Sequence, residues 1–507
     1  MHRLLLLLCL GVQHVHASVA ASRQIAHRVL SRCLKSDAFA DRALHSELAK
    51  ADLTLSDLDR AKATELVYGV MRTSGSLDYQ LELLTSPGLA KKTQHATLCA
   101  LRMGAYEIMH QNTPDFAAVN EAVSLAGSQK SQRAFTNGVL RNLARRKGGG
   151  ELTPATSDES LSQMRALAIE TSTPEWLLKE LSSAPAAGGS ALLGSFDELA
   201  AWAHASQQRP SLALRVNRAR ATRDDVCEAL RDAGLRVEVV EDLDDALLLD
   251  TGGGQVTKLP GFAEGWWSVQ DVGAQVVALL AAPWNADDAA GQTVVLDLCA
   301  APGGKSTHLA ELLHARGHAD ARVLSVEVHA AKARLIEGAC ERLGLDGTVG
   351  VHVADATSPE ALTSLLSAEV GPDALADAVL LDAPCSGLGT LRRNPEHRYR
   401  PASAASYRAL CELQATLLDS AAGALRVGGT LTYSVCSPIL AETETCVAAF
   451  LARHAGRFEV APANENSAVP SEYVADSAAL GAGSIVRTWT HQHQADSHFA
   501  VALRRIA

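Results

Sequence analysis

The chain has 507 residues, with 57 acidic and 46 basic side chains and a formal net charge of −11 at pH 7. This balance excludes a uniformly basic coat for nucleic acid, although local basic stripes can still meet phosphates. Hydrophobic residues make up 47% and charged residues 20% of the sequence. That composition is typical of a globular protein, and the length allows about three domains. The ten cysteines form no C-x-x-C pair and no His/Cys cluster at ligand spacing, so we expect no metal.

The N-terminus has the pattern of a targeting signal. Met1-His2-Arg3 precedes an apolar run from Leu4 to Val12, and Val15-His16-Ala17 offers small residues suited to cleavage. The run is too short to span a bilayer. We interpret residues 1–21 as a signal segment that directs the protein to a plastid or another organelle, with no membrane contact in the mature protein. The alternative is a chance apolar leader on a cytoplasmic protein.

The first half of the remaining chain predicts helices and then a small mixed unit. Apolar residues recur at three- and four-residue spacing over residues 22–147, as at Leu66, Val67, Val70 and Met71, which predicts a compact all-α bundle. Gly148-Gly149-Gly150 and the Ser/Thr/Asp-rich stretch that follows predict a linker over residues 148–172. Helical and strand patterns over residues 173–265 then predict a small α/β unit.

From residue 266 to 507 short apolar segments alternate with helical stretches. We predict strands over 294–296, 323–326, 349–353, 379–381 and 430–433, with helices over 307–315, 330–343 and 404–425. Near-continuous apolar strands between helices indicate a Rossmann-like domain with a mostly parallel sheet covered on both faces. Ligands bind such sheets at the carboxyl ends of the strands.

The first three of these strands end in residues suited to a nucleoside. The turn from Asp297 to Thr307 contains glycines that let the backbone approach a ligand, and it opens a helix whose N-terminal amides suit a carboxylate. Glu327 ends the second strand, where an acid can bind a ribose, and Asp355 ends the third, where it suits an adenine amino group. The spacing also fits a dinucleotide dehydrogenase, but Gly-x-Gly-x-x-Gly is absent from the turn.

The fourth and fifth predicted strands are each followed by a cysteine. Cys385 lies in the segment Asp382-Ala383-Pro384-Cys385, and Cys436 lies in Tyr433-Ser434-Val435-Cys436. A single cysteine at a strand end is usually a small core residue. Two that converge beside a nucleoside pocket indicate nucleophilic chemistry instead.

These motifs resemble the Sun/NOL/NOP family of RNA cytosine-C5 methyltransferases. The resemblance runs from about Trp267 to Leu451 and rests on residues 269–271, 299–305, 327 with 334, 355, 382–389 and 433–438. The helical region is similar to a NusB-type RNA-binding domain through residues 66–70, 102–107, 118–123 and 137–141. The domain order resembles that of bacterial members that act on small-subunit ribosomal RNA.

The resemblance implies methyl transfer from S-adenosylmethionine to cytosine C5. Because C5 is a poor nucleophile, a thiolate must first add to C6. The family pattern assigns this attack to Cys436, product release to Cys385, and a hydrogen bond or proton at ring N3 to Asp382. The implied cofactor residues are Cys299, Ala300, Ala301, Pro302, Gly303, Gly304, Lys305, Glu327, Asp355 and Asp382. The target base must be unpaired or flipped out for C6 to be reached.

Basic residues outside these motifs are candidates for RNA contacts. We expect Arg141 and Arg145 in the bundle, and Arg392, Arg393 and Arg398 after the first cysteine, to meet phosphate or substrate. A further basic group consists of Arg215, Arg218, Arg220 and Arg223. The expected partner is RNA, ribosomal RNA first of all, and the expected oligomeric state is a monomer.

Two segments depart from the family pattern. Thr443 stands between Glu442 and Glu444 where the family has asparagine, and Asp496-Ser497-His498-Phe499 stands for Asp-Gly-Phe-Phe. We expect neither segment to touch the cysteine pair.

Three other functions fit parts of the sequence. A transfer-RNA methyltransferase would use the same motifs. A DNA cytosine-C5 methyltransferase would use a Pro-Cys nucleophile like Pro384-Cys385, but the second cysteine and the helical bundle disfavour it. A non-catalytic RNA-binding or ribosome-assembly factor would be signalled by loss of Cys436 or of the glycine turn, and both are present.

Overall fold

The structure is a computed structural model that describes residues 21–35, 38–51, 55–183, 192–250, 255–283, 292–318, 320–399 and 404–507. Except for Ala21, the predicted signal segment lies outside the described residues. The chain folds into two compact units. Within the described ranges no helix is long and apolar enough to cross a membrane. The same ranges contain no group of three or more His, Cys, Asp or Glu side chains arranged to hold a metal ion.

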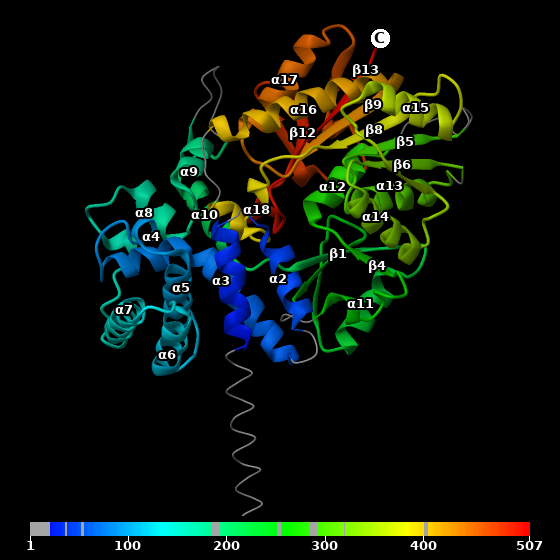
Figure 1. The fold of residues 1–507 in the computed structure, drawn as a ribbon. Coiled ribbons are helices and arrows are strands. Elements are labelled where there is room, and N and C mark those ends of the chain that lie inside the picture. Colours follow the sequence, from blue (N-terminus) through cyan, green and yellow to red (C-terminus); the bar gives the residue numbers. More distant parts are fainter. Residues whose placement is uncertain are drawn as a thin grey trace, which may run out of the picture. The chain divides into compact units, whose positions relative to one another are not determined.

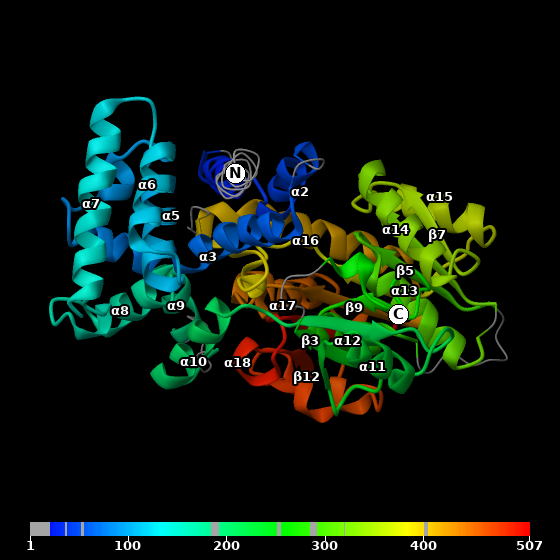
Figure 2. The same cartoon turned by 90° about the horizontal axis from the view of Figure 1, so that it is seen from below.

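The first unit is helical. Residues 21–35 form a helix, and the following helices are α2 (Ala40–Lys50), α3 (Asp57–Glu82), α4 (Leu89–Lys92), α5 (His95–His110), α6 (Asp115–Leu125) and α7 (Lys130–Gly148). Helix α5 packs against α3, α6 and α7, and α5 to α7 lie side by side in Figures 1 and 2. The apolar stripes face inward, since Leu66, Val67, Leu101 and Leu140 are fully buried. The predicted all-α bundle is confirmed.

The helical unit also contains segments that the sequence placed elsewhere. It takes in α8 (Gln163–Glu170), α9 (Glu175–Ser182), α10 (Phe196–Gln207) and residues 391–399. These segments belong to the same compact unit as the helices. Residues 173–183 and 192–209 pack with the helices rather than with the small α/β unit. Residues 391–399, in the middle of the predicted methyltransferase domain, do the same.

The second unit begins with a small antiparallel sheet. Strands β1 (Leu212–Val216), β2 (Arg236–Val239), β3 (Ala246–Asp250) and β4 (Trp267–Val269) run in the order β2-β3-β1-β4, with α11 (Arg223–Asp232) packed against them. A capping box fixes the start of α11, because the Thr222 hydroxyl accepts from Asp225 N and the Asp225 carboxylate accepts from Thr222 N. The sheet extends beyond residue 265 to include β4.

The large sheet of this unit supplies the expected parallel core. Its five parallel strands are β5 (Val294–Leu298), β6 (Arg322–Glu327), β7 (Val349–Val353), β8 (Ala376–Asp382) and β9 (Leu425–Val435). The strand order is β11-β12-β13-β9-β8-β5-β6-β7, with β10 paired to β13. All five predicted strands are present, and the Rossmann-like fold is confirmed.

Helices cover both faces of this sheet, as Figure 1 shows. One face packs against α12 (Val272–Ala281), α13 (Gly304–Ala315) and α14 (Ala330–Leu343), and the other packs against α15 (Pro359–Glu369), α16 (Ala404–Ala424) and α17 (Glu444–Arg453). The sequence analysis missed most of the antiparallel end of the sheet, which is formed by β10 (Phe458–Ala461), β11 (Val474–Ser477), β12 (Gly481–Arg487) and β13 (Phe499–Arg505). Short helix α18 (Thr490–His493) lies between the last two strands.

Candidate active site

The turn after β5 brings the N-terminus of α13 to the carboxyl edge of the parallel strands. Its backbone turns sharply, with φ +63° at Cys299 and +98° at Gly303. Glycine is required at 303 because a side chain there would be strained and its Cβ would lie 3.0 Å from Ile336 Cγ2. A Cβ at Gly304 would meet no atom closer than 3.9 Å, so space remains beside the helix start. A helix N-terminus with free space beside it suits a carboxylate ligand.

Two acids follow the neighbouring strands as predicted. Glu327 is 5% exposed, and its Oε1 accepts from His329 N at 3.0 Å. Asp355 is exposed, and its Oδ1 accepts from Thr357 N and Oγ1. Because β5, β6 and β7 are parallel neighbours, their carboxyl ends share one edge with the turn. The predicted cofactor residues are therefore brought to the same edge of the sheet.

Asp297, the penultimate residue of β5, was left out of the predicted site. Its side chain is fully buried, and Oδ2 accepts from Ser306 Oγ at 2.5 Å. Within the described part of the chain, Oδ1 has no hydrogen-bond partner. Burial raises the pKa of Asp297 to about 7. An unsatisfied buried oxygen near the cofactor turn fits a polar ligand such as the amino group of S-adenosylmethionine. Its position directly before the glycine turn was the signal that could have identified it.

Lys305 and Asp382 form the charged centre of this edge. Lys305 Nζ lies 2.6 Å from Asp382 Oδ2, and Ser434 Oγ donates to Asp382 Oδ1 at 2.7 Å. Burial opposes ionisation of Asp382, but Lys305 and the Ser434 hydroxyl outweigh it and hold the pKa of Asp382 below its usual range. Burial likewise opposes the charge on Lys305, yet Asp382 raises the pKa of Lys305 above its ordinary value. The site therefore contains an ionised carboxylate paired with an ammonium group.

The two predicted nucleophiles lie next to each other. Cys385 Sγ and Cys436 Sγ are 3.4 Å apart, at the ends of neighbouring strands whose registers pair Leu381 with Tyr433 and Asp382 with Ser434. Both residues are partly buried. The hydrogen bond with Cys436 and burial raise the pKa of Cys385 well above its ordinary value. Cys385 is therefore a protonated thiol at neutral pH, placed to donate to Cys436.

The two segments that depart from the family pattern contact the loops that carry the two cysteines. Ser497 N donates to Gly389 O, and Gly389 N donates to Cys436 O, both at 2.9 Å. The backbone segments at Gly389 and Ser497 approach so closely that a Cβ at Gly389 would lie 2.0 Å from Ser497 O. The carboxyl group of Glu442 accepts from both Ser386 and Ser437, which follow the two cysteines. Distant parts of the sequence thus fix both loops.

Arg215, which the sequence placed in a basic stripe, is fully buried beneath the cofactor turn. Its guanidinium makes a two-point contact with Glu311 at 2.9 and 2.7 Å and donates to Gly304 O at 2.8 Å. It also contacts Gln270 and Thr307. Strand β1 of the small sheet is thereby tied to the first turns of α13.

An Arg215→Met variant is expected to lose about 3 to 5 kcal/mol of unfolding free energy, because removing one partner leaves the largely buried Glu311 carboxylate uncompensated. Urea unfolding of wild type and variant measures the loss. The matched control is Arg218→Met, since Arg218 is exposed and pairs with Asp244 and Asp245 at the surface. Such a pair contributes about 1 kcal/mol or less. Equal losses in the two variants would contradict a special role for Arg215.

The predicted RNA-contacting arginines fall into two groups. Arg141 and Arg145 are exposed on α7 and remain available to phosphate. Arg398 is only 8% exposed, and it donates to the carbonyls of Thr171, Ser172 and Ser206. Its burial lowers the pKa of Arg398 to about 9. The structure thus replaces the expected phosphate contact of Arg398 with a structural role.

Arg398 belongs to a nine-residue segment, 391–399, that makes contacts with the helical unit along its length. The carbonyl of Arg392 accepts from Arg72 Nε and Nη2, and the Arg392 side chain is 8% exposed. Glu396 Oε1 accepts from Ala40 N at 3.1 Å. Arg392 is therefore also corrected to a buried residue, whereas Arg393 is partly exposed. Arg392 and Arg398 are buried for the same reason, which is that their segment packs among the helices of the first unit.

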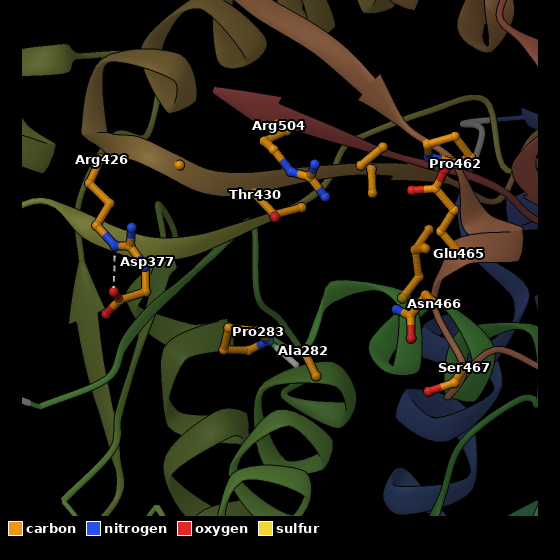
Figure 3. A pocket seen from close by; sticks show the side chains of 14 residues that line it. Ala282, Pro283, Asp377, Arg426, Thr430, Pro462, Glu465, Asn466, Ser467 and Arg504 are labelled. Atoms are coloured by element: carbon orange, nitrogen blue, oxygen red, sulfur yellow. Dashed lines mark hydrogen bonds and ion pairs between the residues drawn. The ribbon is translucent and has the colours of Figure 1, made fainter. Parts of the chain in front are cut away.

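A cavity of about 430 Å³ elsewhere in the second unit is not the predicted site. Figure 3 shows that it is lined by Asp377, Arg426, Thr430, Glu465 and Arg504. Asp377 and Arg426 lie near the starts of β8 and β9, and their side chains form an ion pair at 2.7 Å. The cavity is therefore at the amino ends of the parallel strands, opposite to the edge where such sheets bind ligands.

The fold and the carboxyl-edge residues define a Rossmann-like methyltransferase with an appended helical unit. Three family models match the chain: 16S rRNA methyltransferase RsmB/F over residues 285–504, NusB over 20–145, and the RsmF/B-like ferredoxin-like domain over 173–256. A probable ribosomal RNA small subunit methyltransferase B from Synechocystis is 34% identical over 437 residues, covering 86% of this chain and 90% of the relative.

A second relative, a probable ribosomal RNA small subunit methyltransferase B from Bacillus subtilis, is 33% identical and covers 85% of this chain and 88% of its own length. The crystal structure of the protein PH0851 shares the fold with a TM-score of 0.71 at 23% identity, covering 96% of this chain and 99% of that one. The chain belongs to the ribosomal RNA small subunit methyltransferase B family. Its cofactor is S-adenosylmethionine, which the carboxyl-edge residues fit.

Proposed function

We propose that the protein methylates C5 of a cytosine in small-subunit ribosomal RNA through a covalent bond between Cys436 Sγ and cytosine C6. The observation that carries this proposal is the pair of thiols 3.4 Å apart beside the Lys305–Asp382 ion pair. A single thiol would suffice for most cysteine chemistry. C5 methylation requires two linked events at adjacent carbons, addition at C6 and loss of the proton from C5, so two sulfurs at one place are informative.

Cys385 is the protonated thiol of the pair and lies 3.4 Å from Cys436 Sγ, the sulfur to which we assign the attack on C6. Addition makes C5 nucleophilic, and the cofactor supplies an electrophilic methyl group. Transfer of the C5 proton to water or to a deprotonated Cys385 leaves the C–H electrons as the C5–C6 double bond, and the C6–S bond breaks with its electron pair returning to Cys436 Sγ. We assign assistance in this release to Cys385, whose sulfur is adjacent to the bond that breaks.

Negative charge develops on the cytosine ring when the thiolate adds, and a proton at N3 neutralises it. In the structure Asp382 is an ionised acceptor and Lys305 is the proton carrier. We therefore assign the N3 contact to the ion pair as a unit. Asp382 orients the lysine and accepts hydrogen bonds, and it can donate to N3 only after taking up a proton.

Three observations support RNA as the substrate. The relatives are described as ribosomal RNA small subunit methyltransferases, and the helical unit matches the NusB family. Arg141 and Arg145 are exposed on α7, in a basic group with Arg146 and Lys147. Basic residues of this kind bind phosphates without reading sequence, so they fit a positioning role.

The test is to incubate purified protein with methyl-labelled S-adenosylmethionine and separate samples of small-subunit ribosomal RNA, transfer RNA and DNA. After digestion to nucleosides, we expect label only in 5-methylcytidine from the ribosomal RNA. Label in another nucleoside would overturn C5 chemistry, and label only in transfer RNA or DNA would overturn the substrate. Tight binding of ribosomal RNA without label would favour an assembly factor.

A further inference from the structure

Glu442 lies at the centre of a buried network that connects both cysteine loops. It ends the short helix Leu440–Glu442, which follows β9, and its side chain is fully buried. Four donors converge on its carboxyl oxygens. Oε1 accepts from Ser386 N at 2.8 Å and Gln414 Nε2 at 3.1 Å, and Oε2 accepts from Ser386 Oγ and Ser437 Oγ, each at 2.5 Å.

The donors come from both sides of the thiol pair. Ser386 directly follows Cys385 in the chain, and Ser437 directly follows Cys436. Gln414 of α16 also donates to the carbonyl of Pro384, the residue before Cys385, at 2.9 Å. One carboxyl group therefore holds the residues that follow the two cysteines, and Gln414 connects it to α16.

The main chain of Glu442 adds a further restraint on the Cys436 loop. Its carbonyl accepts from the hydroxyl of Tyr433, near the end of β9, at 2.7 Å. Charged acceptors form short, strong bonds to backbone N–H and hydroxyl groups. A buried carboxyl group fixes the positions of its donors, because a donor that moves away from it finds little water to replace the lost hydrogen bond.

We propose that Glu442 is the positioning residue that holds Cys385 Sγ and Cys436 Sγ at reacting distance. The proposal rests on the proposed roles of the two cysteines, and it assigns the fully buried Glu442 no contact with substrate or cofactor. Without it the Ser386 and Ser437 loops lose their common anchor, and the sulfurs separate. Addition at C6 by Cys436 can then still occur, but release, which needs the second sulfur nearby, slows.

The first test compares Glu442→Ala and Glu442→Gln in steady-state methylation. The alanine variant is expected to lose about 100-fold in kcat, since displacements of about 1 Å at a reacting centre have effects of that size. KM for RNA and for cofactor should stay near wild type. A larger fraction of the alanine variant than of the wild type should be trapped as a covalent RNA complex. Glutamine is expected to restore activity to within tenfold, because its carbonyl oxygen can still accept from Ser386 N while the serine hydroxyls turn to accept from its amide.

A second measurement reports the distance between the sulfurs without RNA or catalysis. Diamide oxidises two neighbouring thiols to a disulfide, and its N=N bond takes up the two hydrogen atoms. The rate of the Cys385–Cys436 crosslink, followed by peptide mass spectrometry, should fall about tenfold or more in Glu442→Ala and remain near wild type in Glu442→Gln. Circular dichroism and cofactor-binding calorimetry show whether each variant is folded.

Glu444→Gln is the matched control. Glu444 is a buried acid two residues further on, but its partner is Arg487 rather than a cysteine loop. The Glu444→Gln variant should crosslink at the wild-type rate. A folded Glu442→Ala variant with wild-type crosslinking and wild-type kcat would overturn the positioning role. If Glu442→Ala slows crosslinking while no variant or wild-type protein methylates cytosine, the positioning stands and the proposed reaction fails.

Discussion

Replacing Cys436 with alanine should abolish methyl transfer, with a rate loss of about 10⁴-fold or more, as for other covalent nucleophiles. Replacing Cys385 with serine should also stop turnover, but at the release step rather than at the addition step. Cys436 would still add to C6, and without the second sulfur the adduct would persist. The first variant is expected to form no covalent complex with RNA, and the second is expected to accumulate it.

Denaturing gel electrophoresis of enzyme mixed with labelled RNA and S-adenosylmethionine separates the two outcomes. Cys411→Ser serves as control, because Cys411 is a partly buried thiol on α16 outside the pair. It should turn over normally. If Cys385→Ser, rather than Cys436→Ala, were the variant unable to form the complex, the roles of the two sulfurs would be reversed.

Changing Asp297 to asparagine is expected to stabilise the protein at alkaline pH. The pKa of Asp297 is raised to about 7 by burial, so the folded protein keeps a proton that the unfolded chain releases near pH 4. Stability contributed by the protonated form is complete below about pH 4 and is lost as pH rises toward 7. Above that pH the buried charge costs up to about 4 kcal/mol, at 1.36 kcal/mol per pKa unit.

The asparagine side chain has the same shape but no charge to bury. Urea unfolding without cofactor should therefore show a variant more stable than wild type by a few kcal/mol at pH 8.5 and nearly equal to it at pH 4. Asp232→Asn, at an exposed position on α11, should show no such trend. A pH-independent difference between Asp297→Asn and wild type would mean that Asp297 is ionised throughout.

The parallel sheet and the thiol pair were predictable because both depend on local patterns. Apolar strands alternating with helices specify β5 to β9, and parallel strands place all their carboxyl ends at one edge. Cys385 and Cys436 could therefore be expected near each other without knowledge of any contact. Helices α13 and α14 follow from the same alternation.

The remaining features depend on partners distant in sequence. Glu442 has the local pattern of a solvated helix start, and two of its donors, Ser386 and Gln414, come from 56 and 28 positions away in the sequence. Arg215 reads as a surface charge until Glu311, 96 positions away, is placed beside it. The short strands β10 to β12 have no intervening long helices, so periodicity gave little signal for them.

The path of residues 391–399 has a consequence for how this protein can be divided. The chain leaves the Cys385 loop, contributes a segment to the helical unit, and returns to begin α16. A truncated protein starting near residue 210 would contain every residue assigned to catalysis. It would also carry the Arg392 carbonyl without its donor Arg72, and Glu396 and Arg398 without the backbone groups that they contact. Trimming the helical unit would thus leave without its partners the segment that begins six residues after Cys385, so the two units are expected to be inherited, expressed and inactivated together.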